Sequence, residues 1–172
     1  SEGTFNAAFV PSYSSLLNDK KKSQKFANNI FNLLILGLFF LVLIIEILMP
    51  LFVFLIAPGF DGNYQKMELA ITLTRITFPF LMFISLASFF SAILNSHNKF
   101  AIASAAPIIL NILLIGVLLF GKILNDKLVH YLSYAVTLSG ILQFTFLYLF
   151  VKKYFSPKLK LRIKIDNKVK IF

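Results

Sequence analysis

The sequence predicts an all-α integral membrane fold with four transmembrane helices, preceded by the end of another helix. Of the 172 residues, 58% are hydrophobic and only 14% are charged, whereas a soluble domain carries about a quarter charged residues. Four apolar stretches are each at least 20 residues long. At a rise of 1.5 Å per residue each covers roughly 30–39 Å, which is enough for a hydrocarbon core of about 30 Å.

The expected elements follow one another with few interruptions. Residues 1–17 are expected to be the end of a membrane helix, because the apolar residues Phe5, Phe9, Tyr13 and Leu16 recur at helical spacing. The four-helix transmembrane region is expected at 18–151, with spans at 33–57, 69–94, 101–120 and 128–151. Before the first span we expect a polar loop that contains Lys20, Lys21, Lys22 and Lys25.

The basic residues are divided unequally between the two sets of loops. Thirteen lie before the first span, between the second and third, and after the fourth, while the other loops carry three. Cytoplasmic loops hold the excess of lysine and arginine, so we expect the first set to be cytoplasmic and residues 152–172 to be a basic cytoplasmic linker. Lysine or arginine alternates with apolar residues over 158–165. This is a strand period, so a strand is the alternative to a solvated or membrane-surface segment.

The composition also excludes several classes of function. The net charge of +10 suits the anionic inner face of a membrane, but nucleic acid binding requires a basic folded surface rather than short basic loops. The absence of cysteine excludes thiolate chemistry. No HExxH, GxSxG or P-loop motif and no carboxylate cluster is present, so we expect no catalytic residue, no metal site and no cofactor. His97 and His130 lie near span ends and are interpreted as interfacial residues.

Two charged residues stand inside the apolar spans. Glu46 lies in the middle of the first span, and Arg75 is the sole charge of the second. A carboxylate that faces lipid costs several kcal/mol, so Glu46 is either a proton or ion site or a structural carboxyl that is neutral or paired. Arg75 is the candidate partner in an intramembrane charge pair. The alternative is that Arg75 extends to the outer headgroups.

Three of the four spans carry an internal proline. Pro50, Pro79 and Pro107 each remove the hydrogen bond to the carbonyl four residues earlier, which predicts three kinks. Broken helices are common in transporters. Small and weakly polar residues form stripes along the second and fourth spans, and these favour close helix packing, with a substrate path as the alternative.

Several segments together resemble one family of transporters. The opening segment contains Glu2, Gly3, Phe5, Ala8, Phe9, Val10 and Pro11 in the order of a motif that ends a membrane helix. Further matches are APGF at 57–60, LTRITFPFLMFISLAS at 73–88, AILNSHNKF at 92–100 and AAPIILNI at 105–112. In this order they resemble the lipid II flippase family (MurJ/MviN), which is part of the multidrug/oligosaccharidyl-lipid/polysaccharide exporter superfamily. The resemblance covers about two thirds of the chain.

The resemblance implies a place and a role for the chain. It implies a fragment from the end of helix 2 to the linker after helix 6, within the N-terminal lobe of a two-lobed transporter. Members flip undecaprenyl-linked peptidoglycan precursor (lipid II) across the bacterial cytoplasmic (inner) membrane by alternating access. The implied partners are therefore membrane lipid and this precursor, and the implied processes are cell wall biogenesis and cell shape. Glu2 matches a family position near the substrate cavity or gate.

The sequence also departs from the family pattern. The arginines of the family's substrate cavity would precede Ser1, so the chain by itself is expected to be a fragment or truncation rather than an active flippase. Two alternatives remain open at this point. One is another polysaccharide or multidrug exporter of the superfamily, and the other is a free-standing small membrane protein with a structural role.

Overall fold

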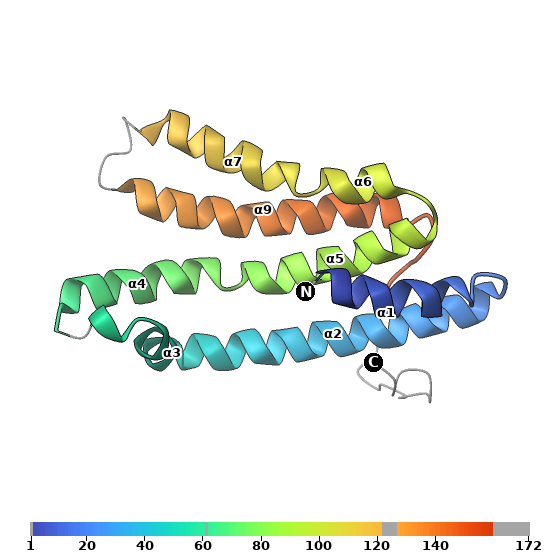
Figure 1. Ribbon diagram of the computed structural model, residues 1–172, viewed down its shortest axis with the longest axis horizontal. Helices are drawn as coiled ribbons and strands as arrows, with labels where there is room; N and C mark the ends of the chain where they lie inside the picture. The colour runs from blue at the N-terminus through green and yellow to red at the C-terminus, as the bar shows by residue number, and fades with distance from the viewer. Residues whose placement is uncertain (1, 61, 122–126, 160–172) are drawn as a thin grey trace.

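The computed structural model describes residues 2–60, 62–121 and 127–159, with side chains from Phe5 onward. Every regular element in these ranges is helical (Figure 1). Four helices are long and apolar enough to span a membrane, namely Lys20–Ile47, Tyr64–Ser96, Phe100–Leu119 and Leu128–Val151. The predicted all-α membrane fold with four spanning helices is therefore confirmed.

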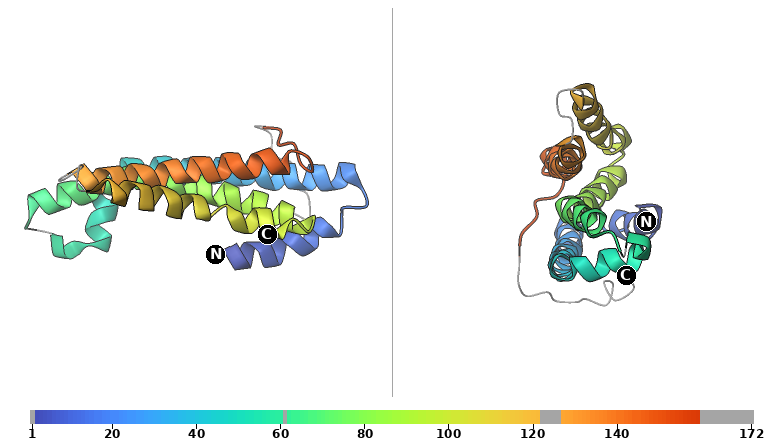
Figure 2. Two further views of the ribbon diagram at one scale, coloured as in Figure 1. Left: turned by 90° about the horizontal axis from the view of Figure 1, so that it is seen from above. Right: turned by 90° about the vertical axis from the view of Figure 1, so that its left-hand side faces the viewer.

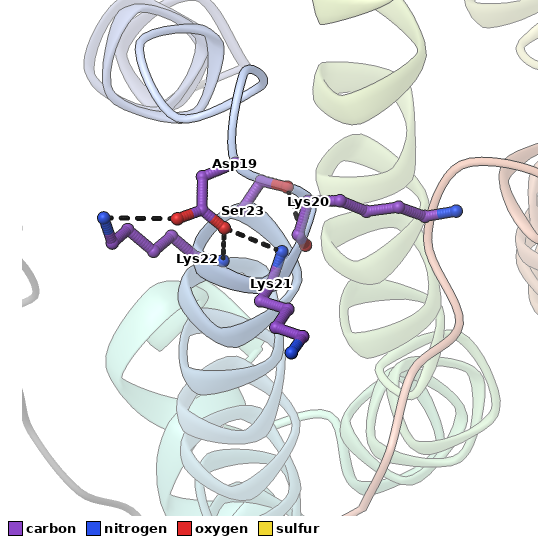
Figure 3. Close-up of polar contacts among 5 residues, drawn as sticks. All are labelled: Asp19, Lys20, Lys21, Lys22 and Ser23. Atoms are coloured by element: carbon purple, nitrogen blue, oxygen red, sulfur yellow. Dashed lines mark hydrogen bonds and ion pairs between the residues drawn. The ribbon is translucent and has the colours of Figure 1, made fainter.

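The first spanning helix begins earlier than the sequence predicts. After α1 (Glu2–Ser14), α2 (Lys20–Ile47) starts at Lys20, so the residues expected in a polar loop form its first turns instead. The carboxylate of Asp19 caps this helix, since its Oδ1 accepts 3.1 Å hydrogen bonds from the amides of Lys21 and Lys22 (Figure 3). Lysine is a good helix former, and a search for apolar runs cannot detect a helix start composed of lysines.

Asp19 has a further consequence for the charge at this helix start. The hydrogen bond from the backbone amide of Lys22 is the main cause that lowers the pKa of the Asp19 carboxyl below its ordinary value. The ammonium group of Lys22, 3.2 Å from the carboxylate, lowers the pKa further. The carboxylate therefore stays ionised at neutral pH and complements the positive end of the helix dipole.

Helix boundaries occur at all three internal prolines. The first predicted span is divided into α2 and α3 (Met49–Ile56), with Pro50 in the first turn of α3, and a short 3-10 turn, η1 (Pro58–Phe60), follows. Figure 2 shows α3 turned away from the axis of α2. The second span consists of α4 (Tyr64–Thr77) and α5 (Phe80–Ser96), separated at Pro79.

The third span is also divided at a proline, whereas the fourth is not. The third consists of α6 (Phe100–Ala105) and α7 (Ile108–Leu119), separated at Pro107. In contrast, α9 (Leu128–Val151) contains no proline, is uninterrupted and coincides with the predicted range. A helix boundary thus coincides with the missing amide donor at Pro50, Pro79 and Pro107. In contrast, Pro11 lies inside α1 without ending it.

The middle of the bundle is formed by α5. It packs against α9, α1, α2 and α6, and Figure 1 shows it lying between α9 on one side and α1 and α2 on the other. It approaches α9 closely at Gly140, where an added Cβ atom would lie 2.8 Å from Cδ2 of Phe80. Gly140 therefore serves helix packing, and Ser133 and Ser139 of α9 are also buried.

The loops alternate between two ends of the bundle. One end, which we call the lysine end, contains the start of α2 at Lys20, the α5–α6 turn with Lys99 and the end of α9 before Lys152 (Figure 1). The other, which we call the α3 end, contains α3, the start of α4, the end of α7 and the start of α9. This alternation is what four successive membrane crossings require.

The segment after α9 returns along α2. The side chain of Gln24 donates to the carbonyl oxygen of Tyr154 at 2.5 Å, and Asn28 Oδ1 accepts from the amide of Lys158 at 2.7 Å. Asn32 Nδ2 donates to the carbonyl of Lys158 at 3.0 Å, and Phe155 is fully buried. The choice between strand and linker for 158–165 falls mainly on residues that lie outside the described part of the chain.

Candidate functional site

The sequence-predicted gate residue lies at the start of α1. Glu2 is the first residue of this helix, and its side chain lies outside the described part of the structure. One turn further along, Asn6 Oδ1 is buried and has no hydrogen-bond partner. The structure therefore places Glu2 one helical turn from an unsatisfied polar group.

That group lines a cavity of about 150 Å³ between α1, α5, α6 and α9. Two more amide side chains with unpartnered buried atoms line it, Asn95 through Oδ1 and Gln143 through Nε2. The hydroxyl-bearing residues Ser88, Ser91 and Ser104 also line this space. We call it the amide cavity. It combines a concave shape with convergent polar groups, which is typical of a binding site.

The amide cavity was not predicted from the sequence. Its three amides come from three helices, so no local pattern connects them. The available signal was Gln143 itself, a large polar side chain in the middle of an apolar span that is 1% exposed. Because a buried amide in a membrane helix is costly without a partner, Gln143 by itself indicates polar groups in its surroundings.

Glu46 and Arg75 lie toward the α3 end of the bundle. Glu46 is in the last turn of α2 and Arg75 is in the last turn of α4. Oε1 of Glu46 is buried without a hydrogen-bond partner, while Arg75 is exposed. The ion pair found in the described part of the chain joins Lys22 and Asp19, and Glu46 and Arg75 do not form a direct bridge there.

The helices around these two residues are held by a small apolar cluster. Met49 and Val53 of α3 pack with Phe78 at the end of α4, and partly buried side chains of α2 and α4 complete the cluster. Ile45, next to Glu46, and Phe78, three residues after Arg75, both belong to this cluster, so the two charged residues flank it without touching.

The two histidines have different surroundings. His97 follows α5 at the lysine end, where its ring stacks on Tyr154 at 4.3 Å and meets Tyr13 edge-on at 6.0 Å. Burial lowers the pKa of His97 below its ordinary value. His130 lies beside Lys127, Tyr131 and Tyr134 at the α3 end. Across the described residues, no group of three or more His, Asp or Glu side chains could hold a metal ion.

Comparison with known proteins identifies the relatives of the chain. The family model described as lipid II flippase MurJ matches residues 1–172. A protein of Rickettsia prowazekii (strain Madrid E) named "Probable lipid II flippase MurJ" is 38% identical over 154 residues, which cover 88% of this chain and 30% of that protein.

Two further relatives agree with this match. A Rhizobium tropici protein of the same name is 36% identical over 157 residues, again 88% of this chain and 30% of the relative. A Burkholderia cenocepacia protein named "Lipid II flippase MurJ" is 38% identical over 92 residues, which are 54% of this chain and 18% of the relative. The chain thus spans about 30% of the length of the first two relatives.

Three findings support the same family: the family model matches residues 1–172, the relatives are up to 38% identical, and four helices can span a membrane. The chain belongs to the lipid II flippase MurJ family.

Proposed function

We propose that this chain forms part of the N-terminal lobe of a transporter that flips lipid II across the bacterial cytoplasmic membrane. The observation that carries the proposal is the family match over residues 1–172, and the four spanning helices agree with it. On this proposal the protein moves its substrate without chemical catalysis. The partners are membrane lipid and the lipid-linked peptidoglycan precursor.

The broken helices give the proposal a mechanical basis. Alternating access is largely rocking or gating of one bundle against another. The second and third spans are each divided at a proline, so their halves can change angle with few hydrogen bonds broken. The uninterrupted α9 packs against both of them and supplies a fixed support.

The orientation of the bundle is part of the same proposal. The lysine end faces the cytoplasm, because basic loops are retained there. Reporter fusions at Lys22, Ser96 and Lys160 should then give cytoplasmic signals, and fusions at Asn63 and Asn125 should give external ones. A cytoplasmic signal at Asn63 would contradict this orientation.

The decisive experiment concerns Glu2 as a substrate-cavity or gate residue. A carboxylate among cavity arginines can close a gate through charge-assisted hydrogen bonds, with which substrate phosphates would compete. In the full-length protein, Glu2→Ala should lower lipid II flipping while membrane levels stay near normal. Glu68→Ala, at an exposed carboxylate on α4, is the matched control and should flip normally. Full complementation of a depleted strain by Glu2→Ala would contradict the role.

We further propose that Glu46 and Arg75 are energetically coupled as an intramembrane charge pair. Arg75→Leu should be mild, because Glu46 can take up a proton, whereas an arginine cannot lose one. Glu46→Leu should lower the membrane-inserted level more, and the double variant should recover part of the loss. The coupling energy should be about 0.5–3 kcal/mol, the range for interacting neighbours. Strictly additive effects would exclude the pair and leave Arg75 as a headgroup contact.

A further inference from the structure

Three residues that line the amide cavity each have a buried polar atom without a hydrogen-bond partner. Gln143 is 1% exposed, yet its Nε2 has no hydrogen-bond partner, and neither have Oδ1 of Asn6 and Oδ1 of Asn95. An unpartnered buried polar group costs about 1–3 kcal/mol, and most such groups in folded proteins are satisfied. Three of them around one cavity indicate a polar ligand.

The lining restricts the charge of that ligand. Besides the three amides, its polar residues are Ser88, Ser91 and Ser104, and the remaining lining side chains in the described part of the chain are apolar. With no arginine or lysine among the described lining residues, these side chains cannot neutralise a phosphate or carboxylate. These described residues also include no aspartate or glutamate, the ligands that calcium prefers. Amide, hydroxyl and carbonyl oxygens do suit monovalent alkali cations.

The helix break beside the cavity adds a backbone acceptor. Pro107 lines the cavity and has no amide hydrogen, so the carbonyl of Ala103, another lining residue, lacks its helical donor. Freed carbonyls and the C-terminal ends of half-helices, which carry partial negative charge, bind Na⁺ in transporters. The side-chain amide of Gln143 can turn about its last torsion and present Oε1 in place of Nε2.

We propose that the amide cavity binds a monovalent alkali cation, with Na⁺ preferred, through the side-chain oxygens of Asn6, Asn95 and Gln143. The volume of about 150 Å³ is well above the roughly 10–15 Å³ that a cavity needs to hold one water molecule, so the ion keeps part of its water shell. With no carboxylate among the described lining residues, binding is weak enough to depend on the Na⁺ concentration. The site joins α1, α5 and α9 across the break between α6 and α7, so its occupancy stabilises one arrangement of these helices.

The test is cation-dependent stability of the purified full-length protein in detergent. Its melting temperature is measured while NaCl replaces choline chloride at constant ionic strength, and the series is repeated with KCl. We expect a saturable rise with Na⁺ and a smaller one with K⁺, because binding to the folded state alone stabilises it. Asn95→Ala and Gln143→Leu should each weaken the apparent Na⁺ affinity about tenfold or more.

The matched control is Asn111→Ala, which removes an exposed amide on α7 outside the cavity and should keep the full Na⁺ response. Since a cavity variant can fail to fold, binding of radioactive ²²Na⁺ to the unaltered protein, competed by unlabelled Na⁺ and not by choline, is the second measurement. Equal melting temperatures in Na⁺ and choline together with no competable ²²Na⁺ would overturn the proposal, as would an unchanged response in both folded variants. The cavity would then hold water only. Neither readout requires transport, so the outcome is separate from that of the flipping assay.

Discussion

The two ends of the bundle are packed in different ways. At the lysine end, α1, α2, α5 and the segment after α9 enclose a continuous aromatic core, in which Phe9, Phe89, Phe90 and Phe155 are fully buried. At the α3 end the buried apolar cluster consists of Met49, Val53 and Phe78, and large apolar side chains of α3 and α7 are exposed. The comparison indicates a more extensively packed lysine end and an α3 end whose apolar side chains are left to contact lipid or further protein.

Removing a ring from the aromatic core should have the largest effect. Phe89 contacts Phe9 at 5.2 Å and both Phe31 and Phe155 at 5.8 Å between ring centroids. Phe89→Ala should lower the free energy of unfolding by about 3–5 kcal/mol, as for other buried phenylalanines. Phe54→Ala, at a ring of α3 that is 41% exposed, is the matched control. Similar losses of thermal stability in both variants would refute the contrast between the ends.

The second prediction concerns the contact between α5 and α9. An alanine Cβ at position 140 would lie 2.8 Å from Cδ2 of Phe80 and 3.1 Å from Cβ of Phe83. Gly140→Ala should therefore destabilise the bundle by about 1–3 kcal/mol, which is typical of overpacking. At Gly37 nothing lies within 4 Å of an added Cβ, so Gly37→Ala should be neutral or stabilising by up to about 1 kcal/mol. If the two glycine variants unfold at the same temperature, the helices are not in close contact at Gly140.

The smallest expected effect is a pH dependence that arises at the lysine end. Burial beside Tyr13 and Tyr154 lowers the pKa of folded His97, so the unfolded chain binds a proton first as the pH falls. The melting temperature should be constant above about pH 7, decline as the pH drops through about 6.5, and level off below the folded pKa. His97→Gln should remove this decline between pH 7.5 and 5, whereas His130→Gln at the α3 end should retain it. An identical pH profile in His97→Gln would show that other groups cause the dependence.

Some features of the fold could be predicted from the sequence and others could not. The four spans were predictable because lipid requires long apolar runs, and the internal boundaries were predictable because proline lacks a donor. The start of α2 was missed, since Asp19 and the lysines that follow it resemble a loop when apolar content alone is considered. Its early start places Phe26, Ala27 and Ile30 in the aromatic core.

The candidate site was less accessible from the sequence than the fold. Glu2 was found through a family motif, and Glu46 and Arg75 through their charge. Asn6, Asn95 and Gln143 give no common pattern, because the spacing of residues along one helix carries no information about which residues of another helix it will face. Their convergence is a tertiary property that follows from α5 lying between α1 and α9.

The hydrogen bonds between α2 and the segment after α9 have a mechanical consequence. Two bonds to Lys158, the bond from Gln24 to Tyr154 and the buried ring of Phe155 form an anchor at the point where the chain leaves the bundle. A pulling force on the chain beyond Leu159 would therefore be transmitted sideways to the first turns of α2 before it could unwind α9. The first and last spanning helices of this chain, α2 and α9, would therefore share such a load.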